Sequence, residues 1–172
     1  MNEAGIHLLL RYTARTTFAL FLFAFTGNAL RDLWPTGLTL WLARKRDWFL
    51  IAMAVSHTLH LAAIIALFQT MGWAKVQATT LVGGGLVYLL IYALALNAVS
   101  RLRAGQEKFL VGGAKSEAVA LYLVWLVFAL AYVPRVISGW PLYSLLGTVA
   151  LAALALRIVC LVRHRRARAA VA

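Results

Sequence analysis

The sequence predicts an all-α integral membrane protein, a single transmembrane domain built as a bundle of five transmembrane helices. Two observations support this fold class. Hydrophobic residues make up 63% of the 172 residues, against roughly 45–50% in ordinary soluble domains. They also gather in five runs of about 20 residues, the length at which a helix crosses the hydrocarbon core of a bilayer. The runs cover about 14–33, 48–71, 78–99, 117–137 and 141–162.

Each run is distinguished by particular residues within an apolar sequence. The first, TTFALFLFAFTGNAL with its flanks, is strongly apolar until Thr26, Gly27 and Asn28 dilute its end. The second contains two histidines, the third contains three consecutive glycines, the fourth is rich in aromatic residues and the fifth contains one arginine. Tryptophans lie beside the ends of the runs, as in the aromatic belts of membrane proteins, with Trp125 inside the fourth run as the exception. The flanking tryptophans are Trp34, Trp41, Trp48, Trp73 and Trp140.

The basic residues predict how the helices are oriented. The chain has 17 Lys and Arg against 5 Asp and Glu, and five spans divide them unevenly between two sides. Twelve fall in the loops 31–47 and 100–116 and in the tail, four fall on the opposite side, and Arg157 lies within the fifth run. Because cytoplasmic loops carry the excess of basic residues, we predict an N-terminus outside and a C-terminus inside. The chain is therefore expected to cross a plasma membrane several times.

The basic loops also indicate the partners of the chain. They lie between apolar runs and form no basic patch with interleaved exposed aromatic residues, so we expect membrane lipid and no nucleic acid as a partner. The segment WPTGLTLWLARKR (34–46) is expected to lie flat on the inner membrane surface as a short amphipathic piece. The first residues do not resemble a cleavable signal, since they lack a basic region and a long apolar stretch.

Two histidines in the second run are the main candidate for chemistry. The stretch AVSHTLHLAAI (54–64) places His57 and His60 three positions apart, on one face of a helix. Counted from Trp48 at 1.5 Å per residue, they lie roughly 14 and 18 Å along the span, close to the bilayer midplane. Ionisable residues at this depth are usually functional, and imidazole is the commonest metal and haem ligand. The alternative is that both histidines only form hydrogen bonds with neighbouring helices.

The third run contributes candidate cavity-lining residues. Gly83, Gly84 and Gly85 remove side chains from nearly a full helical turn, so that another helix or a flat cofactor can approach, and plain helix packing is the favoured of these readings. Tyr88 and Tyr92 lie one and two turns deeper, near the level of the histidines. Either tyrosine can hydrogen-bond an imidazole or a haem propionate, or simply pack within the bundle.

Several absences narrow the function. The five acidic residues lie in loops or at the ends of the runs, which argues against a proton-coupled transporter because such proteins need carboxylates within the membrane. The sequence contains no GxSxG, HExxH, Walker or dinucleotide-binding glycine motif, so electrons would have to come from a partner. Cys160 cannot form an internal disulfide and has no CxxC or Cys/His zinc spacing around it. His7 and His164 are expected to be ordinary residues on the solvent side.

Two segments resemble the ferric reductase-like transmembrane domain superfamily. They are RYTARTTFALFLFAFTGNALRDLWP (11–35) and ARKRDWFLIAMAVSHTLHLAAII (43–65), and ALYLVWLVFALAYVPR (120–135) is similar to a later aromatic-rich helix of that family. The superfamily includes the haem-binding membrane subunit of the bacterial periplasmic methionine sulfoxide reductase system. The spacing from Arg46 to His60 matches the family, and the resemblance implies that His60 is a haem b ligand. The family core has six helices that begin in the cytoplasm; without the first, five remain with the N-terminus outside.

The chain departs from the family at the second haem ligand. The family clamps haem between histidines on two helices, whereas the matching region GGAKSEAVALYLVWLVF (112–128) contains no histidine. Three ways remain to complete a site: His60 acts alone opposite a tyrosine, water or an open position; two copies of the chain each give one histidine; or haem has been lost. His57 and His60 cannot clamp one haem from both faces, but together they can bind one small metal ion.

We therefore predict a haem b-dependent membrane electron-transfer or reductase subunit, with His60 as axial ligand and His57 as second ligand or support. The electron donor implied by the resemblance is a quinone or a separate flavoprotein, and a homo-oligomer is a further expectation. No catalytic residue is predicted. The alternative is a haem-free accessory or scaffold subunit, and a transporter of a small ligand or metal is the least favoured class.

Overall fold

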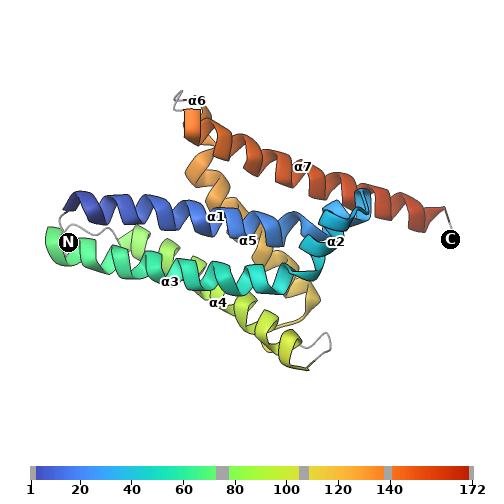
Figure 1. The fold of residues 1–172 in the computed structure, drawn as a ribbon, viewed down its shortest axis with the longest axis horizontal. Helices are drawn as coiled ribbons and strands as arrows, with labels where there is room; N and C mark the ends of the chain where they lie inside the picture. The colour runs from blue at the N-terminus through green and yellow to red at the C-terminus, as the bar shows by residue number, and fades with distance from the viewer. Residues whose placement is uncertain (1–2, 73–77, 105–108, 138–140, 171–172) are drawn as a thin grey trace. The chain divides into compact units, whose positions relative to one another are not determined.

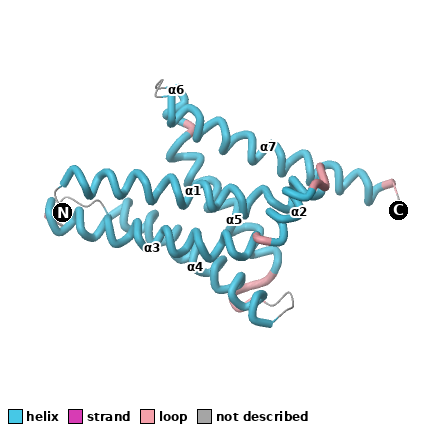
Figure 2. The backbone as a smooth tube through the Cα atoms, in the orientation of Figure 1, coloured by secondary structure: helices cyan, strands magenta, loops and turns pink. Residues whose placement is uncertain are grey.

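The computed structural model describes residues 3–72, 78–104, 109–137 and 141–170, and for residues 71, 78–83, 135 and 137 it describes the backbone alone. The described chain is helical, with short loops between the helices and no strand (Figure 2). The helices are α1 (Glu3–Leu33), α2 (Gly37–Arg44), α3 (Arg46–Met71), α4 (Ala78–Ala104), α5 (Ala114–Tyr132), α6 (Pro134–Ile137) and α7 (Pro141–Ala169). The all-α prediction is confirmed.

Five of the described helices, α1, α3, α4, α5 and α7, are long and apolar enough to cross a membrane. All five also expose large apolar side chains. Leu59 of α3 is 57% exposed, Leu89 of α4 69% and Leu130 of α5 66%. Soluble monomers rarely expose apolar side chains on every long element, because a contiguous apolar surface promotes association. Such side chains are compatible with contact to lipid or to another chain.

The predicted spans differ from the helices at their ends, and three of them differ most. The first helix begins at Glu3 and not near residue 14. Arg11 and Arg15 lower the hydropathy and so shorten the predicted span, but they do not interrupt the helix. The last helix continues to Ala169 through the arginine- and alanine-rich tail, since both residue types favour helix. The prediction of one helix over 117–137 is wrong. Helix α5 ends at Tyr132 and α6 starts at Pro134, because a proline cannot donate an amide proton and disfavours helical geometry in the preceding residue.

The segment 34–46 contains the short helix α2, as expected, although its position on a membrane surface stays a prediction. Thr36 caps its N-terminus: its hydroxyl accepts from the Thr39 amide at 3.3 Å, and the Thr39 hydroxyl accepts from the Thr36 amide at 2.9 Å. A Cβ atom on Gly27 of α1 would lie 3.3 Å from the backbone carbonyl of Leu42 in α2. The glycine in the polar end of the first run therefore allows a close helix approach.

The chain divides into two compact units. The first unit comprises residues up to Phe21 together with Asp47–Val124, and the second comprises Leu22–Arg46 together with the chain from Trp125 onward. In the first unit, α1 and α3 run side by side (Figure 1), and Thr17 of α1 lies 2.9 Å from Ser56 of α3. The fully buried side chains of the first unit include Phe18, Phe21, Leu50, Met53, Ile91, Leu94 and Val124.

In the second unit, two polar side chains hold α7 through backbone carbonyls. The indole Nε1 of Trp125 in α5 donates to the Ala150 carbonyl oxygen at 2.9 Å. Arg157 of α7 donates from Nη1 to the Phe25 carbonyl oxygen at 2.7 Å, and its guanidinium carbon lies 4.6 Å from the centre of the Phe25 ring. These contacts give a packing role to the aromatic and the basic residue that sequence analysis had set apart as exceptions.

Candidate functional site

His57 and His60 lie together on α3 in the first unit. Their ring centroids are 5.4 Å apart and their planes differ by 14°, so the two imidazoles stack along one face of the helix, as their spacing predicts. His57 is only 9% exposed, and His60 is half-buried. The pair therefore places two imidazoles in an interior position on a helix that is otherwise strongly apolar.

Thr13 of α1 holds one ring nitrogen of His60. Its hydroxyl oxygen lies 2.8 Å from His60 Nδ1 and 2.8 Å from the Leu9 carbonyl oxygen. A hydroxyl has one proton, so when Thr13 donates to Leu9 it accepts from Nδ1–H of His60. In that tautomer His60 Nε2 keeps a lone pair, which is the state of an imidazole that binds a metal through Nε2 while its other nitrogen is held by a neighbour.

Helix α4 closes the other side of the pair through two tyrosines. The Tyr88 ring centroid lies 4.2 Å from that of His57, and Tyr92 follows one turn later, 6.2 Å from Tyr88. The Tyr92 hydroxyl lies 2.9 Å from the hydroxyl of Thr58. The two tyrosines are thus near the histidines, as the sequence predicts, but Tyr92 pairs with a threonine and Tyr88 packs its ring on His57.

Two buried polar atoms at this cluster have no hydrogen-bond partner among the described residues: His57 Nδ1 and the Tyr88 hydroxyl oxygen. Leaving such a group unpaired costs about 1–3 kcal/mol. Natural proteins therefore avoid unpaired buried polar atoms unless water, an ion or another ligand satisfies them. Both atoms belong to residues that sequence analysis selected as candidates.

The glycine run behaves differently from the favoured interpretation of close helix packing. A Cβ atom built on Gly84 or Gly85 would meet no atom of the described structure within 4 Å. The described helices therefore leave this part of α4 open. Approach of a further helix or a flat cofactor to this part of α4 stays a prediction, and the surroundings of Gly83 lie outside the described residues.

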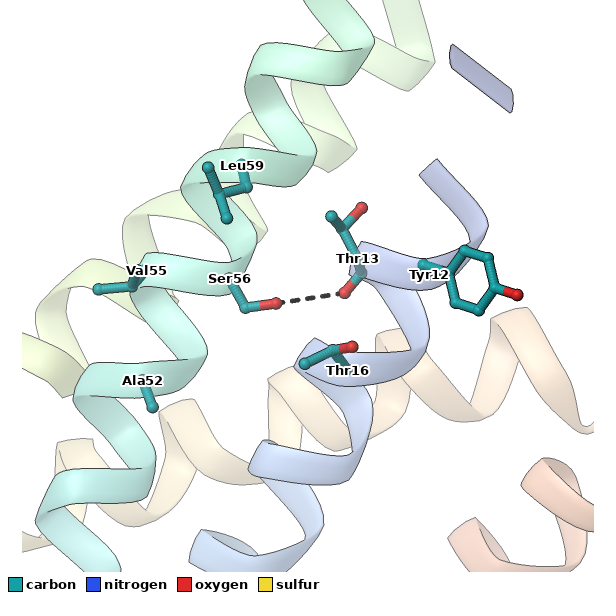
Figure 3. Close-up of a pocket in the computed structure, with 7 residues that line it drawn as sticks. All are labelled: Tyr12, Thr13, Thr16, Ala52, Val55, Ser56 and Leu59. Carbon is teal, nitrogen blue, oxygen red and sulfur yellow. Dashed lines mark hydrogen bonds between the residues drawn. The ribbon is translucent and has the colours of Figure 1, made fainter. Parts of the chain in front are cut away.

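A groove of about 500 Å³ runs along α1 and α3, and Thr13 belongs both to it and to the histidine cluster. Figure 3 shows Ser56 pointing across it to Thr13, whose carbonyl oxygen accepts from the Ser56 hydroxyl at 3.4 Å. The groove is apolar on most of its surface, and the residues that line it are Tyr12, Thr13, Thr16, Ala52, Val55, Ser56 and Leu59. The two imidazoles are not in this lining, so the groove offers no metal ligand of the histidine type.

The first unit also contains a charged cluster that sequence analysis missed. Arg101 of α4 donates from Nη2 to Asp47 Oδ1 at 2.6 Å and from Nη1 to Glu117 Oε2 at 2.6 Å, which ties together the ends of α3, α4 and α5. Asn97, one turn earlier, accepts from the amides of Leu110 and Val111 at 2.9 Å. The signal in the sequence was the presence of opposite charges at three span ends on one predicted side.

Comparison with known proteins finds no family model that matches the chain and no significant match among curated proteins or solved structures. The resemblance to ferric reductase-like domains therefore rests on the residues quoted for it, and on the position of His60.

Proposed function

We propose that this chain is a membrane electron-transfer or reductase subunit that resembles the ferric reductase-like domains, with His60 as an axial ligand of haem b and His57 as second ligand or support. The observation that carries the proposal is the histidine pair on α3: His60 Nδ1 is held by Thr13, and the buried His57 Nδ1 has no hydrogen-bond partner among the described residues. Both features suit imidazoles that can bind a ligand.

The described residues fit one axial position, not a complete haem site. Tyr88 packs on His57 with ring centroids 4.2 Å apart, and helices α4 and α5 carry no histidine. The remaining histidines of the chain are His7 and His164. The ligand on the opposite face of the haem would be a histidine from a second copy of the chain, a tyrosine or a water molecule. Haem b supplies reversible one-electron transfer when bound. The role of Thr13 and the histidines is to bind and orient it.

Electrons would reach this site from a quinone or a separate flavoprotein, because the sequence has no dinucleotide-binding motif. The proposed location is a bacterial inner membrane, with the N-terminus outside and the C-terminus inside. The uneven division of the basic residues supports this orientation.

Reporter fusions test the orientation. A reporter that is active only outside the cytoplasm is expected to be active when fused after Met71 and inactive when fused after Ala104 or at the C-terminus. A reporter that fluoresces only in the cytoplasm should give the opposite pattern. The reverse result at all three positions would show that the chain is inserted the other way round.

Visible spectroscopy tests the haem proposal. Protein purified from haem-replete cells is expected to show a Soret band and a shift on reduction with dithionite, and a pyridine haemochrome assay should identify haem b. His60→Ala is expected to remove the band, because it deletes the proposed axial ligand, and His57→Ala is expected to weaken or shift it.

His7→Ala is the matched control, since His7 is an exposed histidine near the start of α1 that lies 3.7 Å from Glu3. It is expected to leave the spectrum unchanged. A folded preparation, shown by a cooperative thermal melt, that contains no haem would contradict the proposal. A mass measurement in detergent on a haem-containing sample separates one copy per haem from two.

The second candidate function is a haem-free accessory or scaffold subunit. The contact between Tyr88 and His57 favours it, because the tyrosine ring fills space that a porphyrin bound to His57 would need. If the chain is a haem-free subunit, the Tyr88→Ala variant is also expected to contain no haem. In a haem protein the same substitution is expected to enlarge the site and to alter the visible spectrum of the haem.

A further inference from the structure

Three possible metal ligands meet in the second unit, separately from the histidine pair. Asp32 lies near the C-terminal end of α1, and Cys160 and His164 lie on α7. Cys160 Sγ is 3.9 Å and His164 Nε2 is 3.6 Å from the same atom, Asp32 Oδ2. One donor atom of each residue lies within 4.8 Å of the other two.

The surroundings direct these three donors toward one another. Cys160 and His164 are four residues apart, so they lie on the same face of α7. Arg31 donates from Nε and Nη2 to Asp32 Oδ1 at 2.8 and 2.7 Å, which orients the carboxylate and leaves Oδ2 toward α7. Cys160 is buried, whereas the side chain of His164 is 53% exposed. The group is therefore closed on the protein side and reachable from solvent through His164.

We propose that Asp32, Cys160 and His164 bind a divalent cation of the zinc class. One thiolate sulfur, one imidazole nitrogen and one carboxylate oxygen form a mixed donor set that zinc accepts, at ligand distances of about 2.0–2.3 Å. Magnesium and calcium prefer oxygen ligands alone. Tetrahedral ligands at these distances are separated from one another by about 3.3–3.7 Å. The two contacts to Asp32, at 3.9 and 3.6 Å, are already close to this separation, and the sulfur and the imidazole nitrogen, which lie within 4.8 Å of each other, would move closer together.

Binding of the ion changes the protonation of one ligand. The Cys160 thiol loses its proton to solvent as the sulfur–metal bond forms, while Asp32 binds as a carboxylate and His164 through a neutral nitrogen. Three protein ligands leave a fourth tetrahedral position for water or an external ligand. Because Asp32 belongs to α1 and the other two to α7, the ion would link these helices within the second unit.

Zinc titration of the untagged, reduced full-length chain in detergent tests the site. We expect one zinc ion per chain at this site, measured by competition with a chromogenic chelator. Cys160→Ser and His164→Ala are each expected to lower the affinity for zinc by about 100-fold. Loss of a residue that only orients a metal ligand already costs up to about 100-fold, and loss of the ligand itself should cost at least as much. With cobalt in place of zinc, the wild-type chain should show a thiolate-to-metal absorption band that Cys160→Ser lacks.

The controls separate this site from other histidines. His7→Ala removes a histidine that also lies near a carboxylate, Glu3, but has no neighbouring thiol among the described residues, and it should not change zinc binding. The double variant His57→Ala/His60→Ala should also keep this zinc ion. Folding of each variant is checked by a thermal melt without zinc. The proposal is overturned if the folded wild-type chain binds no zinc, or if Cys160→Ser binds it as tightly as the wild type.

Discussion

Replacement of Arg101 by glutamine is expected to lower the free energy of unfolding by about 3–5 kcal/mol, the usual cost of removing one partner from a buried ion pair. The side chains of Arg101, Asp47 and Glu117 are 11%, 19% and 6% exposed. Water can therefore do little to solvate the two carboxylates once the guanidinium is removed. The substitution leaves the two carboxylates of α3 and α5 without the cation that they share. Unfolding in mixed detergent micelles measures the effect.

Two further variants test the cause of this loss. Arg103→Gln removes an exposed arginine two residues away and is expected to change the free energy of unfolding by less than about 0.5 kcal/mol. Arg101→Lys keeps the charge but cannot donate to two carboxylates through a planar fork, so we expect an intermediate loss. Equal losses for Arg101→Gln and Arg103→Gln would show that the cluster contributes nothing beyond surface charge.

Replacement of Gly147 by leucine is expected to destabilise the second unit by about 3 kcal/mol, the upper part of the usual range for overpacking. A Cβ atom at this position of α7 would lie 3.1 Å from the Tyr132 carbonyl oxygen and would overlap Cγ2 of Val136. The Val136 side chain can rotate, but the Tyr132 carbonyl belongs to the backbone and cannot move without displacing the end of α5. The same micelle assay measures the change.

Gly84→Leu is the matched control in α4, where a Cβ atom would meet no described atom within 4 Å. There the higher helix propensity of leucine should dominate, and the variant is expected to gain up to about 1 kcal/mol in isolated chains. The two substitutions are chemically identical but have opposite expected signs. Loss of stability at Gly84 that depends on protein concentration or on added haem would instead indicate that another chain or a cofactor approaches the glycine run.

The helices could be predicted from the sequence because a backbone in lipid must satisfy its hydrogen bonds internally, which makes hydropathy and helix formation coincide. Their ends could not, because hydropathy marks the part of a helix that suits lipid and not the part that is helical. For this reason helix α1 includes Arg11 and begins as early as Glu3. At Pro134 the opposite happens: the apolar composition continues while the helix stops.

The candidate site was predictable along one helix and unpredictable between helices. The stacking of His57 and His60 follows from a spacing of three residues. The contact of Thr13 with His60 depends on how α1 is rotated about its axis, which a sequence with little amphipathic pattern does not specify. For the same reason Cys160 and His164 were assigned no common role: their third partner, Asp32, lies 128 residues before the cysteine.

Helix α1 is also longer than the layer it would cross. Its 31 residues, at 1.5 Å each, extend roughly 46 Å, against about 30 Å for a typical hydrocarbon core. Either the helix tilts strongly or its first turns, with Glu3, His7 and Arg11, stand among the lipid headgroups. The thickness of the host bilayer would then set the depth of Thr13, and with it the depth of the imidazole that Thr13 contacts. In a bilayer, hydrophobic mismatch would thereby act on the candidate site.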